Sequence, residues 1–199
     1  MRFTRVSLIA ASSLCCFVIA GIGLPNIFAQ TAPAESMSEA PKPKYVSPPA
    51  KADVILPNAT ITIDYCAPST HGRTIFGSSD QKPLVPYGEV WRMGANAATT
   101  IKTTGDLQIG DLKVPAGTYT LYSVPSQDGW KLVVNKQTGQ WGTVYDISQD
   151  LGRVAMGTGS TAMPVEKFVI DFEKTVGETT ELHLKWAGVD ASVQITAQK

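Results

Sequence analysis

The polar residues that could do chemistry gather first in the irregular segment around Arg92 and Asn96. The Arg92 guanidinium could form two parallel hydrogen bonds with a carboxylate or could bind a sugar hydroxyl, and the Asn96 side-chain amide offers both a donor and an acceptor. The structural alternative is that Asn96 bonds local backbone in a turn and that Arg92 pairs with an acid such as Glu89. Because irregular polar segments commonly carry binding sites, both residues are candidate ligand contacts. We expect Trp91, beside them, to be a buried core residue.

A second candidate group follows in the chain. Trp141 and Tyr145 share one face if this segment is extended, and Asn135 lies shortly before them at the end of an apolar run. Aromatic rings beside Asn and Arg are typical of surfaces that bind sugars or peptides. The alternative is a hydrophobic cluster beneath the 136–146 loop. The predicted ligand-binding set is therefore Arg92, Asn96, Asn135, Trp141 and Tyr145.

Charged residues also mark two late segments with alternating polarity. Asp171 and Glu173 lie in one, and Glu181, His183 and Lys185 lie in the other. If these segments pair as strands, an acid–His–acid cluster results, and hydrolysis would need two carboxylates about 5–9 Å apart. A solvated sheet face is the interpretation we favour. We therefore assign no catalytic residue.

Metal, cofactor and nucleic-acid chemistry find little support in this sequence. His71 and His183, the two histidines, lie far apart, and Cys66 is the one cysteine beyond the N-terminal leader. Zinc sites require three or four ligands with local pairs, and no nucleotide-binding glycine motif or nucleophile elbow is present. The formal net charge of zero argues against a phosphate-binding face. We expect no metal, no cofactor and no nucleic-acid partner.

The N-terminal part has the composition of an export leader followed by a linker. Arg2 and Arg5 precede an apolar run over Val6–Leu24, and Ala29 supplies a small residue before a cleavage site. This predicts a signal peptide over residues 1–29 and a periplasmic or extracellular protein. The run is about long enough to span a bilayer, so an uncleaved signal is the one membrane contact that we expect. Residues 30–56 are rich in Pro and Ala and predict a disordered linker.

Residues 57–199 show the period-two alternation of half-buried strands. Apolar residues alternate with polar ones over 60–65, 168–173 and 181–186, and Gly110-Asp111 separates two short runs as a hairpin turn does. No window keeps a helical period. The pattern predicts an all-β fold, an antiparallel β-sandwich of the jelly-roll kind with about ten short strands.

Several segments together resemble the bacterial domain of unknown function 2911 family. They are Ser69–Gly77 (STHGRTIFG), Val85–Thr100 (VPYGEVWRMGANAATT), Ile109–Pro125 (IGDLKVPAGTYTLYSVP), Asn135–Lys136, and Trp141-Gly142 with Tyr145. The resemblance implies an exported all-β domain and carries no established activity. Ala97 stands where the family usually has an acid, and Ala67 where it often has Arg. If those side chains belong to a family site, this chain lacks them.

These features favour an exported, non-catalytic binding module with a polar–aromatic patch for a glycan, a peptide or a small ligand. One alternative is a hydrolase of glycans or peptides in the cell envelope, using Asp171, Glu181 or His183. Another is a structural envelope protein without a small ligand.

Overall fold

The computed structural model describes residues 47–199. The predicted signal peptide and residues 30–46 of the predicted linker lie outside the described residues. Within the described part, no helix is long and apolar enough to cross a membrane.

The described part of the chain is built from strands, with two short 3-10 helices. In chain order the elements are β1 (Pro49–Leu56), β2 (Ala59–Cys66), β3 (Phe76–Gly77), η1 (Ser79–Gln81), β4 (Val85–Pro86), β5 (Thr99–Thr103), β6 (Leu107–Ile109), β7 (Leu112–Val114), β8 (Gly117–Val124), β9 (Trp130–Asn135), η2 (Ile147–Gln149), β10 (Asp150–Val176) and β11 (Thr179–Ala197). The predicted all-β, sandwich-like fold is confirmed.

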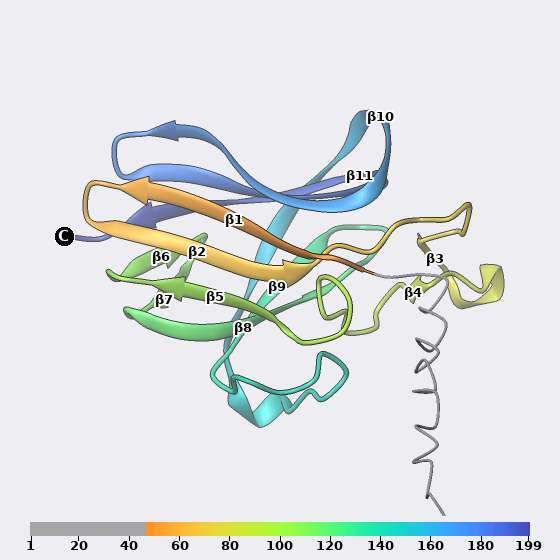
Figure 1. Cartoon of the computed structure of the whole chain (residues 1–199), viewed down its shortest axis with the longest axis horizontal. Coiled ribbons are helices and arrows are strands. Elements are labelled where there is room, and N and C mark those ends of the chain that lie inside the picture. The colour runs from red at the N-terminus through yellow and green to blue at the C-terminus, as the bar shows by residue number, and fades with distance from the viewer. Residues whose placement is uncertain (1–46) are drawn as a thin grey trace, which may run out of the picture. The chain divides into compact units, whose positions relative to one another are not determined.

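One continuous sheet folds over to make both layers of the sandwich (Figure 1). Its strand order is β1-β2-β5-β8-β9-β10-β11-β6-β7, with antiparallel pairing throughout. The first part of β10 pairs with β9, and its later part pairs with β11, so β10 belongs to both layers. β3 and β4 form a small parallel pair of their own, beyond the carboxyl end of β2.

β10 and β11 are much longer than the short strands expected. β10 contains 27 residues and β11 contains 19. Register shifts between Ser160 and Val169 interrupt the β10–β11 ladder, and such bulges let a strand bend from one layer to the other. β11 turns back on itself near Ala187, which has a φ of 52°, and the Ala197 N–H then bonds to the Glu178 carbonyl at 2.8 Å. The alternation of polar and apolar residues is interrupted at these bends. The sequence therefore predicts several short strands where the structure has two long, bent ones.

The folded domain also begins earlier than predicted. The composition of residues 49–56 predicts a disordered linker, but these residues form β1, which pairs with β2 over its whole length. Ala52 and Leu56 are buried, while Val54 is half-buried. The alternation of buried and exposed residues is typical of a strand. Pro48 and Pro49, at its start, nevertheless give the segment the composition of a linker.

An aromatic cluster fills one part of the core. Trp91 stacks on Trp186 with ring centroids 5.6 Å apart, and Phe76 and Phe168 meet Trp91 edge-on at 5.5 and 4.9 Å. Such pairs are worth about 0.5–1.5 kcal/mol each beyond the burial of apolar area. The cluster therefore fixes the backbone at Trp91, which is buried as expected.

Candidate functional site

A pocket of about 510 Å³ lies against this aromatic cluster. Trp91 and Trp186 contribute to its lining, and its walls come from three connecting segments: residues 68–73, 84–96 and 142–145. A cavity of this size, with aromatic surface and a few polar groups, has the dimensions of a small-molecule site.

The segment after Trp91 has an unusual backbone. Met93, Gly94 and Asn96 all have positive φ, at 51°, 150° and 60°. The Cys66 carbonyl accepts a hydrogen bond from the Ala95 N–H at 3.2 Å, and a Cβ on Gly94 would lie 2.7 Å from the same oxygen. At Gly94 another part of the backbone thus comes close enough to leave no room for a side chain. Strained conformations of this kind persist only where the surroundings hold them, and they concentrate at functional sites.

Arg92 lines the pocket without a polar partner among the described residues. Its Nε is shielded from solvent and has no hydrogen-bond acceptor there, and the alternative pairing with Glu89 is not formed. Gly142 lies over its aliphatic stem, so close that a Cβ on Gly142 would come within 2.3 Å of the Arg92 Cδ. The stem of the arginine is therefore held by packing, and its Nε is buried without an acceptor among the described residues.

Asn96 joins Arg92 at the pocket and is exposed. Its backbone carbonyl accepts from the Gly142 N–H at 3.0 Å, while its side-chain Nδ2 reaches the Ser47 carbonyl only at 3.5 Å. The backbone contact fixes the residue, and the amide retains most of its hydrogen-bonding capacity.

Tyr145 also lines the pocket, but its hydroxyl is already engaged. It donates to the Asp150 carboxylate at 2.6 Å and accepts from Arg153 at 2.7 Å. Burial, followed by the interactions with Asp150, raises the pKa of Tyr145 to about 12. Its ring meets Tyr122 edge-on, and Tyr122 donates its own hydroxyl to the Val144 carbonyl at 2.7 Å. These tyrosines offer the pocket ring surface more than hydroxyl groups.

The structure does not bring Asn135 to the pocket. Its side chain is fully buried, and its amide donates to the Asp146 carbonyl at 2.9 Å and to the Asp150 carboxylate at 2.8 Å. Its Oδ1 accepts from the Gln137 N–H at 3.0 Å. Asn135 thus uses its hydrogen bonds to hold the loop that follows β9.

Trp141 lies beside the pocket, outside the lining. It is 57% exposed, it is bridged to Ala97 through the backbone, and it immediately precedes Gly142. The expected cluster beneath the 136–146 loop therefore does not include Trp141. Of the five predicted contacts, the structure gathers Arg92, Asn96 and Tyr145 at the pocket, places Trp141 at its edge and keeps Asn135 away.

Sequence reasoning did not select His71 and Arg73, which also line the pocket. The Glu166 carboxylate accepts from the Thr70 hydroxyl and from the His71 N–H, and Arg73 donates from Nε to the Thr70 carbonyl at 2.9 Å. The two bonds to Glu166 tie the segment to β10, and the Arg73 bond stabilises the turn within the segment. The sequence indicates this part of the pocket only through the polar residues of Ser69–Gly77. Their contact with Glu166 cannot be inferred from residue spacing, because the two segments are far apart in the sequence.

The model of one protein family, described as protein of unknown function (DUF2911), matches residues 47–195. This chain belongs to the DUF2911 family. No curated protein and no solved structure matches it. In this DUF2911 domain the matched range contains every described strand except the last residues of β11.

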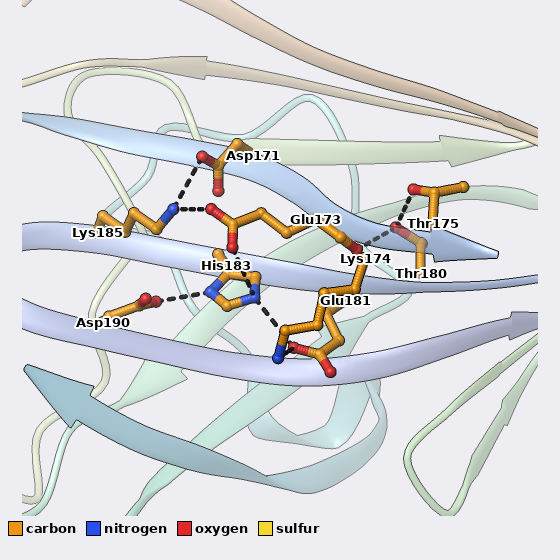
Figure 2. Close-up of polar contacts among 9 residues, drawn as sticks. All are labelled: Asp171, Glu173, Lys174, Thr175, Thr180, Glu181, His183, Lys185 and Asp190. Carbon is orange, nitrogen blue, oxygen red and sulfur yellow. Dashed lines mark hydrogen bonds and ion pairs between the residues drawn. The ribbon is translucent and has the colours of Figure 1, made fainter. Parts of the chain in front are cut away.

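The two late charged segments do pair, on β10 and β11, and the acid–His–acid cluster conditional on that pairing forms on the DUF2911 domain (Figure 2). The favoured interpretation of a solvated sheet face does not hold for His183, which is buried. The His183 ring lies between carboxylates: Nδ1 is 2.8 Å from Asp190, and Nε2 is 3.2 Å from Glu181 and 3.7 Å from Glu173. The His183 side chain is only 8% exposed. Both ring nitrogens already face a carboxylate, so neither is open to a substrate.

Lysines complete this cluster. Lys185 binds Asp171 at 3.2 Å and also binds Glu173, while Lys174 binds Glu181 at 2.9 Å. The hydrogen bond from Lys185 lowers the pKa of Glu173, and the one from Lys174 lowers the pKa of Glu181. Among residues 47–199, no three His, Cys, Asp or Glu side chains are grouped so that they could hold a metal ion. The cluster is a network in which each carboxylate lies within ion-pair distance of a lysine or of the His183 ring.

Proposed function

We propose that this DUF2911 domain is a non-catalytic binding module whose ligand enters the 510 Å³ pocket and places a carboxylate on Arg92. The observation that carries the proposal is the uncompensated guanidinium: within the described residues, packing holds Arg92 in position and no acid neutralises it. Such a group is preorganised for a bidentate, charge-assisted contact with a carboxylate.

The contrast with the His183 cluster favours binding over hydrolysis. A general base needs a ring nitrogen or carboxylate within reach of a substrate proton. His183 is almost enclosed, and Glu173 and Glu181 are each engaged by a lysine. At the pocket, by contrast, the Arg92 Nε is buried without an acceptor among the described residues.

Export is part of this proposal. Its support comes from the leader pattern of Arg2, Arg5, the Val6–Leu24 apolar run and Ala29. A binding module behind a Pro-rich linker would then act in the periplasm or outside the cell. Pulse-labelling of the full chain, with detection of a shortened form in the exported fraction, checks this part separately.

The pocket is tested by calorimetry with a panel of small carboxylates and their neutral amides on wild-type protein and the Arg92→Ala variant. Removing a charge-assisted contact costs about 1.5–3 kcal/mol, so the variant should lose about 10- to 150-fold in affinity. Because Arg92 has no described polar partner, the melting temperature should shift by only a few degrees. Lys113→Ala, an exposed cation on β7, serves as the control.

Equal binding of carboxylates by the wild-type protein and Arg92→Ala would refute the assignment of Arg92. A preference of the wild-type protein for the neutral amides would refute the proposed charge of the ligand.

A further inference from the structure

We infer that the ligand is an acidic saccharide, a chain of sugar units in which one carboxylate binds Arg92 and a neighbouring ring packs on Trp141. The inference rests on the proposed function of the pocket and names its ligand class. Two separate observations meet in it: the arginine without a described polar partner, and the exposed indole of Trp141, whose chain neighbour Gly142 lines the same pocket.

Trp141 differs from the other three tryptophans of the chain. Trp91, Trp130 and Trp186 are buried in the aromatic cluster, whereas Trp141 is 57% exposed and makes no ring contact with the described aromatic residues. A large amphipathic ring left in water is a common feature of recognition surfaces. A flat aromatic face of this kind suits the C–H face of a sugar ring.

A short ladder between two loops holds this indole beside the pocket. The Ala98 N–H donates to the Gln140 carbonyl at 3.3 Å, and the Gly142 N–H donates to the Asn96 carbonyl at 3.0 Å. Trp141 lies between these two bonds, and Gly142, the next residue, packs on Arg92. The backbone that carries Trp141 is therefore joined by hydrogen bonds to the segment that follows Arg92.

The polar groups of the pocket fit sugar hydroxyls better than a phosphate. Arg92 only donates, Glu89 only accepts when ionised, and Asn96 and Thr143 can do both. A phosphate carries more negative charge than a carboxylate and offers more acceptor oxygens, so it would need more N–H donors, whereas a carboxylate is satisfied by one guanidinium fork. The hydroxyls of a sugar can donate to Glu89 and accept from Asn96.

An extended peptide fits this surface less well. Peptides in that form bind by adding a strand to a free sheet edge, where unpaired backbone groups receive them. At the pocket rim, the backbone groups of Asn96, Ala98, Gln140 and Gly142 are paired with one another. Recognition there has to use side chains, as it does for a saccharide.

The test compares an oligogalacturonate with its methyl ester, a neutral chain of the same length and linkage, and with a non-sugar dicarboxylate, succinate. Affinities are measured by calorimetry and by quenching of tryptophan fluorescence. Wild-type protein should prefer the oligogalacturonate over the ester by about tenfold or more, and Arg92→Ala and Arg92→Lys should lose this preference. Trp141→Ala should weaken the binding of the oligogalacturonate about tenfold. Ile147→Ala, which removes another exposed apolar side chain of the same loop, should bind as wild type.

The outcomes separate this inference from the proposed function. Binding of succinate through Arg92, with oligogalacturonate bound no better and with no effect of Trp141→Ala, overturns the saccharide and leaves the carboxylate pocket standing. Equal affinity for the acid and its methyl ester overturns the acidic part of the inference. Absence of binding to every probe, in a folded protein, counts against both.

Discussion

The strained turn that presents Arg92 depends on Gly94, and the substitution Gly94→Ala tests that dependence. Gly94 has a φ of 150°, a conformation that residues with a side chain rarely adopt. A Cβ at this position would also lie 2.7 Å from the Cys66 carbonyl oxygen and 3.3 Å from the Thr99 hydroxyl. The backbone oxygen cannot rotate away as a flexible side chain could, so β2 or the turn itself has to move.

Both costs can be estimated. A residue held in a sparsely populated backbone region costs about 1–3 kcal/mol, and forcing extra atoms into a filled space typically costs about another 1–3 kcal/mol. Gly94→Ala should therefore destabilise the folded protein by about 2–6 kcal/mol. Gly129 separates the two contributions, because its φ is 142° but a Cβ there would meet nothing within 4 Å. Gly129→Ala should show the backbone cost alone, about 1–3 kcal/mol.

Urea unfolding followed by tryptophan fluorescence measures the free energies of unfolding. Gly188→Ala supplies the baseline, because Gly188 has no φ in the left-handed region and a Cβ added to it would meet no atom within 4 Å. This variant should stay within about 1 kcal/mol of wild type. If Gly94→Ala and Gly129→Ala lose the same free energy of unfolding, the close approach to Cys66 contributes nothing and the account of the turn is wrong.

Two further predictions concern buried and charged networks. Asn135→Ala should lower the free energy of unfolding by about 2–4 kcal/mol in the same urea assay, because the buried groups that bond to its side-chain amide lose their partner. A decrease below about 1 kcal/mol would contradict its structural role. Lowering the pH should also weaken the fold. The pKa values of Glu173 and Glu181 are lowered in the folded protein, so their stabilisation is complete above the ordinary value of 4.5 and is lost as the pH falls through the folded pKa values. Urea midpoints at about pH 7 and about pH 3.5 should differ less in Glu173→Gln than in wild type; equal differences would exclude a contribution from Glu173.

The fold was largely predictable because strand alternation is a local property. The alternation over 60–65 follows directly from one buried face and one more polar face, and Gly110-Asp111 does join β6 and β7. The length of β10 was not predictable in this way. Its bends at Ser160–Val169 depend on pairing with two different strands, and that information lies outside any local window.

The site was predictable only where its residues are close in sequence. Arg92 and Asn96 could be selected because an irregular polar turn next to Trp91 is conspicuous without any structure. Asn135 is also a polar residue near aromatic ones in the sequence. In the structure, however, the loop after β9 folds back, and the Asn135 amide donates to Asp146 and Asp150. Residue type identifies a group that can bind, but only tertiary structure decides whether another part of the chain has already occupied it.

That distinction decides between the two polar centres of the domain. His183 has residue types typical of catalysis around it, but Asp190, Glu181 and Glu173 enclose its ring, and lysines engage the glutamates. Arg92 has no residues typical of catalysis around it. Gly142 packs on its aliphatic stem, and no acid among the described residues forms an ion pair with it. Folding leaves the desolvation of the Arg92 Nε uncompensated, a cost that a bound carboxylate would offset. The strain at Met93, Gly94 and Asn96 falls on the same segment, which is the arrangement expected where a fold sacrifices stability to present a binding group.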